Sequence, residues 1–123
     1  MIYFETIMDT ITINITNVIG DTYAVEANDG EKVFELVSKA LDDKRKISVS
    51  FQNIEMITTA FLNTAFGKLY KDYSEDHIRH YLSVTNISPS GTVALKRVID
   101  TAKLYYKDPD AMQSSIDEIM EEE

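Results

Sequence analysis

Residues 51–70, Phe-Gln-Asn-Ile-Glu-Met-Ile-Thr-Thr-Ala-Phe-Leu-Asn-Thr-Ala-Phe-Gly-Lys-Leu-Tyr, form the stretch that decides the fold. They predict the end of a strand, a short hydroxyl-bearing turn and the start of an amphipathic helix that Thr58 or Thr59 can cap. The apolar stripe of this helix is wide enough to be buried against a sheet and consists of Phe61, Leu62, Ala65, Phe66, Leu69, Tyr70 and Tyr73. Because open α/β sheets place their working surface at the carboxyl ends of strands, this turn is the predicted binding surface.

The flanking sequence alternates between strand and helix patterns. Strict alternation predicts a strand over 10–16, and Gly20-Asp21 predicts a turn that returns the chain as a paired strand over 22–26. The segments expected next are a helix capped by Asn28, a third strand over 47–52, the helix of the quoted stretch, a short helix capped by Ser74, a fourth strand over 81–87 and a long helix opened by Ser88-Pro89. This order predicts an α/β fold with a mixed sheet of about 4–5 strands and crossover helices packed on it.

Size and composition favour one globular domain of the cytoplasm. The chain has 123 residues, of which 44% are hydrophobic, and this is enough for one core. It has no cysteine, which excludes disulfides, thiolate metal sites and cysteine nucleophiles. The amino terminus lacks the basic region of a signal peptide, and no stretch approaches the ~20 apolar residues of a membrane span. We therefore expect a soluble cytoplasmic protein with no membrane partner.

The net charge of −9 belongs mostly to the carboxyl end. Residues 108–123 contain seven acids and no Lys or Arg, whereas residues 1–107 contain 14 acids and all 12 basic residues. We expect a domain over 1–107 and an acidic helix or tail over 108–123, whose narrow apolar strip comprises Met112, Ile116, Ile119 and Met120. Because the body carries no basic stripe to neutralise phosphates, direct binding of nucleic acid is not expected.

A set of residues running through this alternation matches a known pattern: Asp29-Gly30, Phe51, Ile54, Ile57, Thr58-Thr59-Ala60-Phe61, Asn63, Phe66-Gly67, Leu69 and the later run Val84-Thr85-Asn86-Ile87-Ser88-Pro89. The pattern resembles the STAS domain (sulfate transporter and anti-sigma factor antagonist). It is more closely similar to a STAS-like family of uncharacterised bacterial and phage-borne proteins. The resemblance covers roughly residues 8–105 and leaves out the acidic tail.

The resemblance implies a non-catalytic regulatory module. STAS domains mostly dock on a protein partner, which for the anti-sigma factor antagonists is an ATPase-type kinase. That kinase phosphorylates a serine at the start of the helix after the third strand, which adds a charge of about −1.5 to −2. The serine falls on Ala60, which has no hydroxyl and departs from the pattern. Thr59 is then the candidate phosphorylation site, although helix capping is the role we expect for it.

We expect the loop and helix over 57–71 to dock on a protein partner, with an ATPase or kinase-type regulator as the first candidate. The predicted partner-binding residues are Thr58, Thr59, Ala60, Asn63, Thr64, Gly67 and Lys68. For Gly67, which lies inside the helix, we expect close approach to the sheet or to a neighbouring strand. The alternative is a self-assembling or inhibitory protein that acts through its amphipathic acidic carboxyl-terminal helix. The sequence leaves the oligomeric state open.

No motif in the chain points to catalysis, a cofactor or a metal. His77 and His80 are three residues apart and could share a helix face, but no third histidine or cysteine accompanies them as a ligand. The Gly-x-Ser-x-Gly turn of a serine hydrolase is absent. We therefore expect no enzymatic activity.

Overall fold

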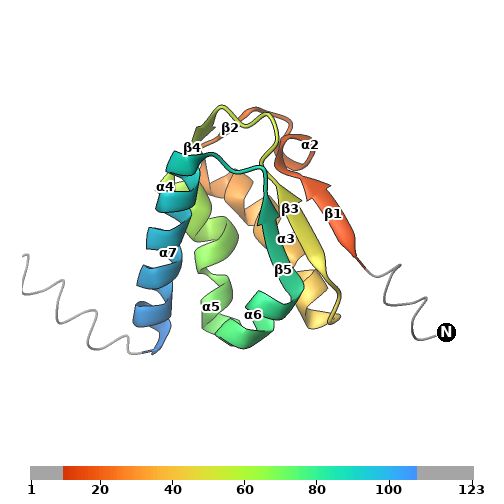
Figure 1. Ribbon diagram of the computed structural model, residues 1–123, viewed down its shortest axis with the longest axis vertical. Helices are drawn as coiled ribbons and strands as arrows, with labels where there is room; N and C mark the ends of the chain where they lie inside the picture. Colours follow the sequence, from red (N-terminus) through yellow and green to blue (C-terminus); the bar gives the residue numbers. More distant parts are fainter. Residues whose placement is uncertain (1–9, 108–123) are drawn as a thin grey trace, which may run out of the picture.

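The computed structural model describes residues 10–107, whose central element is a parallel sheet of three short strands. The strands lie in the order β1-β3-β5 and comprise β1 (Ile11–Asn14), β3 (Ile47–Ser50) and β5 (Leu82–Thr85). Apolar and polar residues alternate along them, so that Ile47 and Val49 are buried while Ser48 between them is partly exposed. The apolar face of the sheet lies against the helices (Figure 1).

The predicted hairpin between the first two strands is wrong. Residues 15–16 leave the strand and begin the helix α2 (Ile15–Ile19), which ends at Gly20 in the left-handed conformation, with φ 71°. The chain then enters β2 (Tyr23–Ala24), which pairs in parallel with β4 (Met56–Ile57) and forms a second sheet with it. Because α2 carries the chain away from β1, β2 finds its partner in a segment more than 30 residues further along.

Helical segments connect the strands, as the sequence predicts. α3 (Ala27–Asp42) precedes β3, and four segments lie between β4 and β5: α4 (Thr59–Leu62), the π-helical η1 (Asn63–Gly67), α5 (Leu69–Asp72) and α6 (Glu75–Tyr81). The described part of the chain ends with α7 (Pro89–Lys107). The expected cap at Ser74 and the expected proline at the first position of α7 are confirmed. The cap expected at Asn28 is wrong, because α3 begins earlier, with Glu26 at its N-cap.

The core lies between the apolar face of the sheet, α3 and the run α4-η1-α5. Its largest fully buried side chains include Phe61, Phe66, Ile15 and Leu41. The rings of Phe51, just after β3, and Phe66 in η1 lie 6.1 Å apart and join the sheet to the helices. α7 packs on α4, η1 and α5 from the outside (Figure 1). The run α4-η1-α5 is therefore the middle of the helical layer, with α3 on one side and α7 on the other.

The α/β class with crossover helices is confirmed, but the single mixed sheet is not. Within residues 10–107 the strands form two separate sheets, and every pairing is parallel. The acidic helix or tail predicted over 108–123 lies outside the described residues. No helix within the described range has the length and apolar character needed to cross a membrane.

Candidate functional site

The predicted binding turn is held in place by the hydroxyl group of Thr58. Its Oγ1 accepts a hydrogen bond from the backbone N–H of Phe61, at 3.2 Å, and donates one to the backbone oxygen of Val25. The backbone N–H of Thr58 also donates to the carbonyl of Ala24, at 3.1 Å. One threonine therefore caps α4 and ties its start to the end of β2.

Because Thr58 is the cap, Thr59 plays a different role from the one expected. Thr59 is the first residue of α4 and is exposed, and its hydroxyl makes no hydrogen bond with the part of the chain that the structure describes. The interpretation of Thr59 as the helix cap is wrong. Its hydroxyl points out at the start of a helix, next to the equally exposed Ala60.

The helix widens just after this start. From Asn63 to Gly67 it is π-helical, and the N–H of Lys68 donates to the carbonyl of Asn63, five residues earlier, at 3.0 Å. Such π-helical turns are often found at functional sites. Gly67 is buried, and a Cβ there would lie 2.6 Å from Oδ1 of Asn63 and 3.2 Å from Cγ1 of Val98. The close approach expected at Gly67 is therefore to α7 and not to the sheet or a strand.

Gly30 of α3 allows a similar close approach to the run α4-η1, on the side opposite to α7. A Cβ at this position would lie 2.6 Å from the backbone oxygen of Phe61, 3.1 Å from Cβ of Thr64 and 3.2 Å from the backbone nitrogen of Ala65. Glycine thus lets the backbone of α3 contact that of α4 and η1. This contact gives a physical reason for the glycine of the Asp29-Gly30 pair in the sequence pattern.

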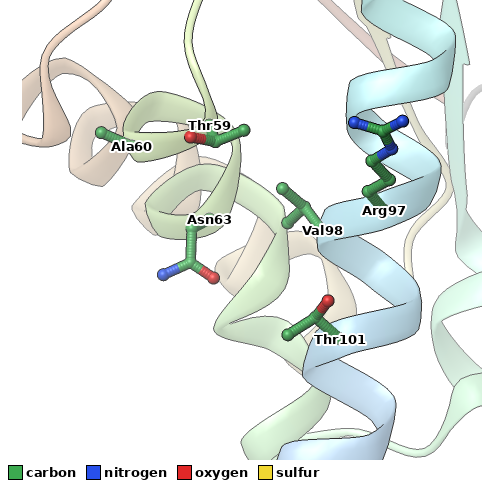
Figure 2. A pocket seen from close by; sticks show the side chains of 6 residues that line it. All are labelled: Thr59, Ala60, Asn63, Arg97, Val98 and Thr101. Atoms are coloured by element: carbon green, nitrogen blue, oxygen red, sulfur yellow. The ribbon is translucent and has the colours of Figure 1, made fainter. Parts of the chain in front are cut away.

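A groove opens between the start of α4 and the middle of α7. It has a volume of about 480 Å³ and is lined by Thr59, Ala60, Asn63, Arg97, Val98 and Thr101 (Figure 2). Val98 is buried and forms the apolar floor, and the other five lining residues are exposed. Arg97 is the one charged residue of the lining, and it makes no ion pair within residues 10–107. The groove thus combines an apolar floor with a polar rim that carries one positive charge.

The predicted site residues divide between two sides of the helix. Thr59, Ala60 and Asn63 face the groove, whereas Thr64 and Lys68 face α3. The ammonium of Lys68 lies 2.6 Å from a carboxylate oxygen of Glu31 and 4.4 Å from the ring centre of Phe34. Lys68 is therefore already engaged within the fold. The groove brings together Thr59, Ala60 and Asn63.

Three groove residues did not emerge from the sequence as site residues: Arg97, Val98 and Thr101. The sequence predicts the helix opened by Ser88-Pro89, which contains all three residues, but no binding role for them. Thr101 stands three residues after Val98 and four after Arg97, so it neighbours both on the surface of the helix. The sequence does not show that α7 packs beside the start of α4, and so it could not connect the two segments.

The two histidines lie apart from the groove and contact other partners. Nε2 of His77 lies 2.9 Å from the backbone oxygen of Leu41, and its ring stacks on that of Tyr73, with centres 5.7 Å apart. The ring of His80 contacts that of Tyr81. Within the described residues there is no cluster of three metal-ligating side chains. His77 therefore links α6 to the end of α3.

Comparison with known protein families finds a match for the central part of the chain. Residues 29–92 match a STAS-like domain of unknown function. The match runs from the Asp29-Gly30 pair through the capped turn to the first residues of α7, and it is shorter than the 8–105 expected. Neither a curated protein nor a solved structure matches the chain significantly. The match covers more than half of the 123 residues, and the chain therefore belongs to this family of STAS-like domains of unknown function.

Proposed function

We propose that this chain is a non-catalytic regulatory module that binds a protein partner through the groove between α4 and α7. The exposure of the groove supports this proposal, since five of its six lining residues are exposed. Small-molecule sites bury about 70–90% of the surface of their ligand. A groove with walls this open would leave most of a small ligand in water, whereas a segment of another protein can cover the whole rim.

The chemistry of the rim carries the proposal. The Thr59 hydroxyl, the Asn63 amide and the Arg97 guanidinium make no side-chain hydrogen bonds with the described part of the chain. They surround the buried side chain of Val98. Polar groups with unused hydrogen-bonding capacity around an apolar centre are the usual composition of a protein interface. A partner that presents one apolar side chain, flanked by hydrogen-bonding groups and an acid, would fit this surface.

The family resemblance suggests an ATPase-type kinase or another nucleotide-binding regulator as the first partner to test. Ala60 has no hydroxyl, and the hydroxyl of Thr58 is engaged with Val25 and Phe61. Thr59 has the exposed hydroxyl of the turn. If the partner transfers a phosphate, we expect it on Thr59, where the new charge would lie within the groove that the partner contacts.

Co-purification from the native host tests the proposal. We expect a full chain carrying Thr59→Asp and Asn63→Arg to lose the specific partner that the wild-type chain retains, as identified by mass spectrometry. The matched control carries Thr12→Asp and Gln52→Arg, which make the same chemical changes at exposed positions outside the groove. Retention of every specific partner by the groove variant would contradict the proposal, and so would equal loss in the control. The same spectra show whether Thr59 carries a phosphate.

A further inference from the structure

The outward face of α7 carries exposed apolar residues at both ends. Val93 and Leu104 are each 55% exposed and lie on this face, whereas Tyr105, which is 40% exposed, is rotated by about 100° around the helix from Leu104. These are three of the six large hydrophobic residues that are exposed in the described part of the chain. Val93 and Leu104 are separated by about three helical turns, or roughly 16 Å. Single exposed apolar residues are common on proteins, so Val93 and Leu104 gain meaning through the charged residues that lie between them on the same face.

Two opposite charges lie between these apolar ends. Arg97 and Asp100 occupy the same face as Val93 and Leu104, and the four residues fall within an arc of about 60° around the helix. Arg97 has no ion-pair partner among residues 10–107. Asp100 lies 3.0 Å from Nζ of Lys96 and 3.9 Å from Nζ of Lys103, in surface ion pairs that contribute little to stability. The stripe Val93-Arg97-Asp100-Leu104 is thus apolar, basic, acidic and apolar in turn.

This stripe is complementary to itself when a second copy runs in the opposite direction. An antiparallel alignment about the midpoint between residues 98 and 99 places Val93 opposite Leu104 and Arg97 opposite Asp100. In a two-fold symmetric pair each of these contacts occurs twice. A parallel alignment would instead place Arg97 opposite Arg97 and Asp100 opposite Asp100. We propose that this face of α7 binds a second copy of the chain as an antiparallel helix pair.

The proposed dimer leaves the floor of the groove accessible, and Arg97 lies on the edge that the groove shares with the paired face. Val98, the floor of the groove, is rotated by about 100° around α7 from Arg97, so that the groove opens on the flank of the paired face. The dimer would present two grooves. A pair of single helices buries an area at the low end of protein interfaces, so we expect weak association that depends on protein concentration.

The charges of the stripe allow a decisive test with the full chain. We expect the wild-type protein to shift from the 14.0 kDa monomer toward twice that mass as its concentration rises from about 10 μM to about 1 mM, in sedimentation or light-scattering measurements. Arg97→Asp and Asp100→Arg should each weaken self-association about tenfold or more, because each places like charges opposite one another. Mixing these two variants should restore the dimer, since each then faces the opposite charge of the other.

Two further variants serve as controls. Leu104→Glu should abolish the dimer, whereas Leu36→Glu, at the exposed Leu36 on α3, should leave the mass unchanged. Circular dichroism verifies that all variants remain folded. A wild-type chain that stays monomeric throughout the range overturns the proposal, as does a mixture that fails to associate. Loss of the dimer in Ile116→Glu, with no effect of the Arg97 and Asp100 changes, would overturn it in favour of tail-driven assembly.

Discussion

Replacing Gly30 with alanine should destabilise the protein more than the same change at Gly91. Both glycines are buried in helices, and a Cβ at either position would enter occupied space. At Gly30 the atom nearest to the Cβ is the backbone oxygen of Phe61, at 2.6 Å. Because the backbone of a packed helix cannot turn aside, α3 would have to move away from α4 and η1. At Gly91 the nearest atoms all belong to side chains: Cδ1 of Ile57 and Cγ1 of Ile87, both at 2.8 Å, and Oγ of Ser88 at 3.0 Å, and side chains can move more readily than a helix backbone.

The size of the difference follows from two opposing terms. Inserting a methyl group into packed space costs about 1–3 kcal/mol, and alanine regains up to about 1 kcal/mol of helix propensity over glycine. For Gly30→Ala we expect a net loss of about 1–2 kcal/mol, because the contacts are with backbone atoms. For Gly91→Ala, side-chain adjustment costs about 0.5–1.5 kcal/mol, so the two terms nearly cancel.

Urea unfolding followed by circular dichroism measures both free energies, provided that the dependence on urea concentration is the same in the three proteins. If Gly30→Ala is as stable as the wild type, the close contact between α3 and α4 does not constrain the fold. An equal loss in Gly91→Ala would show that the distinction between backbone and side-chain neighbours is wrong.

Two further predictions concern hydroxyl groups. Thr58→Ala should lower the free energy of unfolding by about 1–2 kcal/mol because it removes the cap of α4, while Thr59→Ala should change it by less than about 0.5 kcal/mol. Equal losses of the two variants in urea unfolding would refute the assignment of the cap to Thr58. Burial and the hydrogen bond to Asp42 raise the pKa of Tyr73 from 10.0 to about 12. The folded protein then holds this proton more tightly than the unfolded chain, so its stabilisation is complete below pH 10 and is lost as the pH rises toward 12. In Tyr73→Phe the free energy of unfolding, measured at a series of pH values, should fall less steeply between pH 10 and 12. An unchanged pH dependence would show that Tyr73 is not the cause of this loss.

Local sequence signals predicted the helical parts of the fold well. The cap at Ser74 and the proline at the start of α7 act on backbone groups only a few residues away, so the neighbouring sequence is enough to identify them. The start of α4 was located to Thr58 or Thr59, but the role of cap was assigned to the wrong one of the two. The predicted hairpin failed because strand pairing joins residues that are distant in the chain. The short segment Tyr23–Ala24 can form hydrogen bonds along either of its edges, and its sequence pattern does not identify the strand with which it pairs.

The candidate site was predicted in part for the same reason. The sequence identified Thr59, Ala60 and Asn63, because a turn that follows a strand and opens a helix is recognisable locally. It did not identify Arg97 or Thr101, which reach the groove only because α7 packs against η1 at Gly67.

The sequence by itself determined the α/β class, the family and the helix that begins after Thr58, since each depends on periodicity and on caps within a few residues. The tertiary structure alone decided that β2 pairs with β4, that Thr59 and not Thr58 has an unused hydroxyl, and that α4 and α7 form a groove. These features depend on which surfaces come within contact distance, and contact distance is a property of the packed chain and not of any short segment.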